Sequence, residues 1–168
     1  MNFDPRRTAK LYYLKFLRLK GEPCFLARGI AVGTFIGITP TIPFHSLLAL
    51  AFAFLLRGSK VAALLGTVVV SNPLTFFFQY YFSWQIGNLL LPGKHSWEDV
   101  SELINLVTND APYRETLAAM SHVGLNSLTV LIVGGIILAI PFTAVVYFLS
   151  YKFFHALRQK RLEKKVLD

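Results

Sequence analysis

Three long stretches of the chain contain no Asp, Glu, Lys or Arg: residues 29–56, 61–93 and 116–151, which are 28, 33 and 36 residues long. A helix needs about 20 predominantly apolar residues to cross the ~30 Å hydrocarbon core of a bilayer. Each stretch exceeds that length, and a soluble core rarely needs three such runs within 168 residues. The pattern therefore predicts an all-α integral membrane protein.

The first stretch is interrupted by Pro40 and Pro43. Its two arms, residues 29–38 and 44–56, are about 15 Å and 20 Å long as helices, so neither spans alone. Prolines remove backbone donors and disfavour helix just before them. We expect the stretch to form a re-entrant hairpin. The alternative is one kinked full span.

The second stretch has a similar interruption at Ser71-Asn72-Pro73. We expect a half-helix before this break and a span leading outward after it, which together make a broken span over residues 61–91. The last span, residues 124–151, brings the chain back. The fold then contains the hairpin, a proline-broken helix and about two full transmembrane spans.

Charge decides which side each segment faces. The net charge is +8, but the basic residues flank the apolar stretches, seven of them in residues 1–28 and six in residues 152–168. Basic flanks mark the cytoplasmic side. The acidic segment 94–115 suits the outside, and the linker Arg57-Gly58-Ser59-Lys60 suits the cytoplasm.

These charges predict a membrane domain at residues 29–151 between a cytoplasmic basic arm and a cytoplasmic basic tail, with both termini on the same side. The kinked-span alternative would leave one basic terminus outside. No nucleic-acid recognition motif accompanies the positive charge, so membrane lipids are the expected partners and nucleic acid is not.

Three glycines recur every fourth residue in the first arm, at Gly29, Gly33 and Gly37. Small residues at this spacing allow the backbones of two helices to approach closely. Because one copy of the chain is small for a complete transporter, we expect this ridge to serve as the seam of a homodimer.

Several local runs resemble one bacterial family. They are Arg28-Gly29, Gly33 to Pro40 (GTFIGITP), Ala62 to Thr67 (AALLGT), Ser71 to Thr75 (SNPLT) and Tyr80-Tyr81. Over about residues 28–91, and more weakly up to the last span, the chain resembles the bacterial membrane family of domain of unknown function 2062. The resemblance implies a location in the bacterial inner membrane, where the predicted spans make the chain multi-pass, and it carries no established activity. Some relatives are fused to glycosyltransferase domains, which makes an envelope enzyme a candidate partner.

The two breaks are the strongest candidates for a binding site. Interrupted helices expose N–H and C=O groups at membrane depth, and paired interruptions are typical of transport sites. His45 is the one ionisable residue within either broken stretch, and such residues are functional candidates. The structural alternative is that the hydroxyl groups only satisfy the freed backbone. The candidate binding residues, with Arg28 at the mouth of the hairpin, are Arg28, Thr39, Pro40, Thr41, His45, Ser71, Asn72, Pro73 and Thr75.

Catalytic patterns are absent from the sequence. It has no nucleophile elbow, no phosphate-binding loop and no metal-ligand spacing, so neither an enzyme nor a cofactor is expected. We predict a transporter or translocator of an anionic or polar solute or lipid headgroup, acting at the paired breaks. The alternative is a non-catalytic structural or accessory subunit of an envelope enzyme or transporter.

Overall fold

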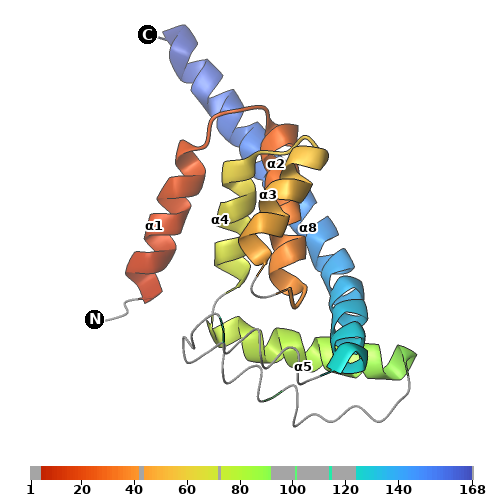
Figure 1. The fold of residues 1–168 in the computed structure, drawn as a ribbon. Helices are drawn as coiled ribbons and strands as arrows, with labels where there is room; N and C mark the ends of the chain where they lie inside the picture. Colours follow the sequence, from red (N-terminus) through yellow and green to blue (C-terminus); the bar gives the residue numbers. More distant parts are fainter. Residues whose placement is uncertain are drawn as a thin grey trace.

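The computed structural model describes residues 5–41, 44–71, 73–91, 101, 114 and 124–167, and this part of the chain is helical, without strands. The helices are α1 (Pro5–Arg18), α2 (Pro23–Ile38), α3 (His45–Leu55), α4 (Lys60–Val70), α5 (Pro73–Leu90) and α8 (Gly124–Leu167) (Figure 1). The all-α prediction is therefore confirmed. Most of the predicted external segment, 94–115, lies outside the described residues.

Proline and serine set the helix ends. Pro23 begins α2 and Pro73 begins α5, at the first helical position, where a missing N–H costs nothing. Helix α2 stops at Ile38, because Thr39 precedes Pro40 and a residue before proline avoids the helical conformation. Ser59 caps α4 by accepting a hydrogen bond at Oγ from the Ala62 N–H, at 3.3 Å. Both predicted breaks are present.

Helix α2 lies at the centre of the molecule and is largely buried. Figure 1 shows α2, α3 and α4 side by side as successive antiparallel helices, with α8 running along them. Among the described helices, the contacts of α2 with α4 and α8 are the most extensive, together with those between α5 and α8. The turn from α3 to α4 and the C-terminal half of α8 lie toward the same end.

The glycine ridge of α2 faces α4 of the same chain. A Cβ atom on Gly29 would lie 2.9 Å from Ala62 Cβ, and one on Gly33 would lie 2.8 Å from Thr67 N and closer still to Ala63 O. The three glycines are buried in this contact. The predicted dimer seam at Gly29, Gly33 and Gly37 is therefore wrong, because a neighbouring helix already occupies the ridge.

A second close helix contact joins α5 to α8. Gly87 lies against the backbone of Val130, and Gly134 lies against the backbone of Ser83. Tyr80 and Leu131 form a small buried cluster beside these contacts. Helix α5 is bent by 88° from α4, so it runs crosswise below the α2–α4 group (Figure 1).

One helix of the described residues, Ser127–Glu163 within α8, is long and apolar enough to cross a membrane. Only 28% of its most apolar window is buried, unlike the core helix of a soluble protein. These properties indicate membrane association. The bent pair Lys60–Val70 and Thr75–Leu90 passes the same test only when taken together, so the second predicted span is not a straight helix.

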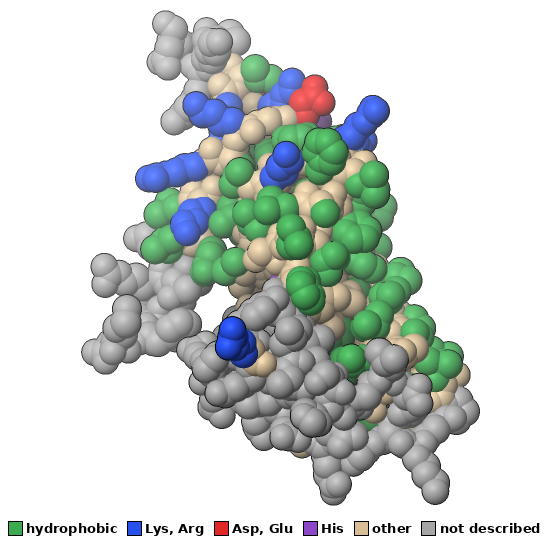
Figure 2. Space-filling view, viewed as in Figure 1, with side chains coloured by type: hydrophobic (Ala, Val, Ile, Leu, Met, Phe, Trp, Pro, Cys, Tyr) green, Lys and Arg blue, Asp and Glu red, His purple; other side chains and the backbone are tan. Residues whose placement is uncertain are grey.

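Charge and apolar surface are separated on the molecule. Figure 2 shows hydrophobic side chains over the middle of the visible face and most of the Lys and Arg side chains toward one end. At that end α1 is fastened to α8, because the Arg161 guanidinium donates to Leu19 O at 3.3 Å and also to Leu17 O. The predicted basic tail is a continuation of α8.

Candidate functional site

The first break is stabilised by hydrogen bonds within its own backbone. Thr39 is buried, and its Oγ1 donates to Phe35 O at 2.9 Å. The Thr39 carbonyl accepts from Thr41 N at 2.8 Å and from Thr41 Oγ1 at 3.4 Å, and the His45 imidazole donates to it as well. Residue 43, four positions later, is a proline and has no N–H to offer this carbonyl. Thr41 and His45 take the place of that donor.

The second break is built in the same way. The carbonyl of Val70, the last residue of α4, accepts from Thr75 Oγ1 at 2.6 Å and from Gln79 Nε2 at 3.1 Å. Both donors come from the first two turns of α5. A buried carbonyl without a partner would cost about 1–3 kcal/mol. The side chains of α5 thus stabilise the end of α4 across the bend.

One hydrogen bond joins the two breaks. Ser71 Oγ, just after α4, donates to Gly37 O near the end of α2 at 3.0 Å. One turn earlier, Thr67 Oγ1 donates to Gly33 O at 3.2 Å. The structure therefore brings together the segments that the sequence marked as a pair. The hydroxyls of Thr39, Thr41, Ser71 and Thr75 all donate to backbone carbonyls.

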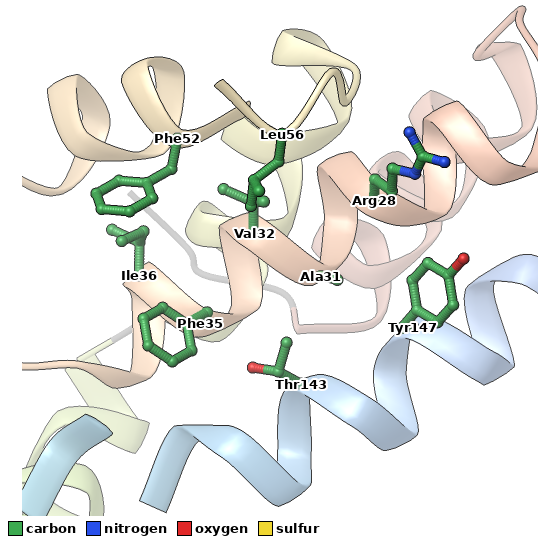
Figure 3. A pocket seen from close by; sticks show the side chains of 9 residues that line it. All are labelled: Arg28, Ala31, Val32, Phe35, Ile36, Phe52, Leu56, Thr143 and Tyr147. Atoms are coloured by element: carbon green, nitrogen blue, oxygen red, sulfur yellow. The ribbon is translucent and has the colours of Figure 1, made fainter. Parts of the chain in front are cut away.

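A hollow lies away from the breaks, in a groove between α2, α3 and α8 (Figure 3). Its volume is about 550 Å³ and its walls are almost entirely apolar. Arg28, Val32, Phe35 and Ile36 line it from α2. We call it the Arg28 groove. Phe52 of α3, Leu56 directly after α3, and Thr143 and Tyr147 of α8 complete it.

Polar groups occupy one end of the Arg28 groove. The guanidinium of Arg28 lies beside the Tyr147 hydroxyl, which is also 3.6 Å from Cys24 Sγ. Arg28 is exposed. Among the described residues no group of three or more His, Cys, Asp and Glu side chains could hold a metal ion. The groove thus offers an apolar channel with a cation at its mouth.

Comparison with known proteins places the sequence in a family. The model of the family described as "uncharacterized protein conserved in bacteria (DUF2062)" matches residues 6–163. The chain belongs to the DUF2062 family. No curated protein and no solved structure matches it. The match extends the resemblance seen over residues 28–91 to almost the whole chain, including α1 and α8.

The predicted site residues of this DUF2062 protein lie in two groups. Thr39, Thr41 and Ser71 lie at the joined breaks, where His45 bonds to the Thr39 carbonyl and Thr75 to the Val70 carbonyl. Pro40 contacts α8, where a Cβ on Gly135 would lie 3.3 Å from Pro40 Cγ. Asn72 lies outside the described residues, and the side chain of Pro73 is not described.

Arg28 lies with the second group, the groove residues, which the sequence did not predict. A signal was available, because Arg28, Val32 and Ile36 repeat every fourth residue along one helix face. That signal identifies only the wall of the groove that α2 forms. The other walls come from residues 52–56 and 143–147, and no local pattern connects these to Arg28.

Proposed function

We propose that this DUF2062 protein is a multi-pass protein of the bacterial inner membrane with both termini in the cytoplasm. The gathering of basic side chains at one end of the molecule supports this orientation (Figure 2). Helices α2 and α3, of 16 and 11 residues, start and return at that end, and at about 24 Å and 16 Å they suit a re-entrant hairpin.

The far end of the molecule holds α5 and the start of α8 (Figure 1). These helices pack together through Gly87 and Val130, so the end of α5 and the start of α8 lie at the same end of the molecule. This supports an external position for residues 94–115. Helix α8 makes one full crossing, and the bent pair α4–α5 makes the second, with α5 lying across the outer side.

Within this membrane domain the protein acts as a translocator of an anionic or polar headgroup, without catalysing a reaction. The observation that carries the proposal is the hydrogen bond from Ser71 Oγ to Gly37 O, which joins two interrupted segments at their breaks. Paired interrupted helices are the usual scaffold of transport sites at membrane depth. The helices beside the breaks meet through backbone and small side chains, so no large side chain lies between them.

A second function is favoured by a different observation. The hydroxyls of Thr39, Ser71 and Thr75 donate to backbone carbonyls, which is what a purely structural role requires. In that case the protein is an accessory subunit that packs against an envelope enzyme or transporter. Its exposed apolar faces on α3, α5 and α8 would provide the contact surface.

Reconstitution in proteoliposomes separates the two functions. Asn72→Leu removes an amide at the second break, and we expect it to lower headgroup flipping or anion uptake about tenfold while insertion persists, since a lost polar contact has about this effect. Gln85→Leu is the matched control, because it makes the same change at an exposed position of α5. If nothing is transported, and Asn72→Leu instead releases a partner protein in pull-downs, the accessory role replaces the translocator.

A further inference from the structure

The Arg28 groove combines features that a lipid would need. Figure 3 shows Val32, Phe35, Ile36 and Phe52 forming its apolar part, with Arg28 and Tyr147 together at the other end. Leu56, which lines the groove, directly precedes Arg57 in the basic turn between α3 and α4. The charged mouth therefore faces the basic end of the molecule, and the apolar part extends toward the breaks.

The size of the groove limits what can fill it. A methylene group is similar in size to a water molecule, which takes ~30 Å³ in the liquid. The groove volume of about 550 Å³ then corresponds to on the order of 18 such groups. One long acyl chain has about this number of groups. The two chains of a phospholipid together would need about twice the volume of the groove. Phe52 and Leu56 are 41% and 52% exposed, so the groove opens sideways to the lipid.

The charged and polar groups at the mouth of the Arg28 groove determine which lipid headgroup binds there. Arg28 has no ion-pair partner among the described residues, whose acidic members are only Glu22 and Glu163. A guanidinium binds a phosphate group through two parallel hydrogen bonds, and the neighbouring tyrosine hydroxyl can donate a third. Along the wall of the groove, the buried Thr143 hydroxyl has no hydrogen-bond partner among the described residues. It offers a donor to an ester carbonyl.

We propose that the Arg28 groove binds one acyl chain of an anionic phospholipid from the basic-end leaflet, with the lipid phosphate on Arg28 and Tyr147. The inference rests on the proposed function, since it makes this groove the loading site of the translocator. It names the substrate class as a phosphate lipid with negative net charge. The lipid enters through the open side of the groove, past Phe52 and Leu56.

Photo-crosslinking in nanodiscs tests the proposal on the full chain. The probes are phosphatidylglycerol and phosphatidylcholine analogues that carry a diazirine in one acyl chain, and mass spectrometry locates the label. We expect phosphatidylglycerol to label α2 and α8 peptides that line the groove. Arg28→Gln should reduce this labelling about tenfold, as expected for a lost charge-assisted hydrogen bond. The control Arg57→Gln, at an exposed arginine outside the groove, should change it less than twofold.

A second variant blocks the apolar part. Leu56→Trp adds bulk from an exposed position, so it should abolish labelling by filling the groove without disturbing the core. Equal labelling by both lipids, or equal losses in the Arg28 and Arg57 variants, would overturn the proposal. A dimer that Leu56→Trp dissociates would also overturn it, because the groove would then hold a second copy.

Binding and transport can fail separately in these experiments. If anionic lipid labels the groove in an Arg28-dependent manner but proteoliposomes show no flipping, the binding site stands and the translocator function fails. If flipping occurs and does not depend on Arg28, the function stands and the groove is not its loading site.

Discussion

Single residues decide how closely the helices approach. Gly33 touches the backbone of Ala63 and Thr67, and Gly66 of α4 lies against Ile30 of α2 in return. Each glycine allows a carbonyl of the facing helix to occupy the space that a Cβ would need. The same closeness allows Thr67 Oγ1 to reach Gly33 O. The spacing of the glycines predicted a close helix contact, but it did not predict which helix would supply it.

Gly33→Leu should therefore disrupt the fold of the single chain and not an assembly of two chains. Overpacked contacts cost about 1–3 kcal/mol or more, and here the backbone of α4 has no room to move away from the added side chain. We expect loss of the monodisperse gel-filtration peak in detergent and a lower unfolding temperature. Ala144→Leu, at an exposed position of α8, is the matched control. A variant that unfolds at the wild-type temperature but changes oligomeric state would restore the dimer seam.

The direction of helix α5 differs from the one that its local sequence pattern predicted. Its 18 residues are uncharged and nearly long enough to cross the membrane, which led to the prediction of a span. In the structure it is bent by 88° from α4. Thr75 and Gln79 bond to Val70 O at the bend, and Gly87 packs against α8. These contacts fix the crosswise direction.

The depth of α5 in the bilayer tests this direction. Fluorophores attached at Phe77→Cys and Leu89→Cys, both exposed positions, should report equal depths in quenching experiments with brominated lipids. A span along the membrane normal would separate the two positions by about 18 Å, at 1.5 Å for each of 12 residues. Phe142→Cys and Lys152→Cys on α8 serve as the calibrating pair for a crossing helix. A large depth difference in α5 would return it to a conventional span.

On the face seen in Figure 2, most of the described Lys and Arg side chains lie toward one end of the molecule, and this asymmetry gives it an orientation. The turn Arg57–Lys60 lies at the end where α8 carries its basic residues, and the end of α5 and the start of α8 lie at the other end. Because basic residues face the cytoplasm, the two ends should differ in access from outside the cell. Within this turn, Ser59 is unsuitable as a site for a cysteine label, because its side chain is buried and caps α4.

Cysteine labelling on intact spheroplasts checks the orientation. In a Cys24→Ser background, Arg114→Cys should react with an impermeant thiol reagent, because it is exposed in the predicted external segment. Lys60→Cys, which is also exposed, should react only after the membrane is opened. Reaction of Lys60→Cys from outside would show that residues 29–56 form a full span and would rule out the hairpin.

The sequence by itself determined the helical character of the chain and its two breaks. These features depend on local chemistry: uncharged runs of sufficient length and the missing N–H of the prolines at 40 and 73. The family followed from short runs of the same kind.

Only the tertiary structure decided the contacts between helices. In a chain with so many apolar faces, residue pattern cannot say which face meets which, because each pairing buries similar surface. The partner of the Gly29–Gly33–Gly37 ridge, the use of Thr41, His45 and Thr75 to satisfy carbonyls, the bend of α5 and the Arg28 groove all depend on such pairings. Residues more than a hundred positions apart, such as Arg28 and Tyr147, meet only once the helices have packed.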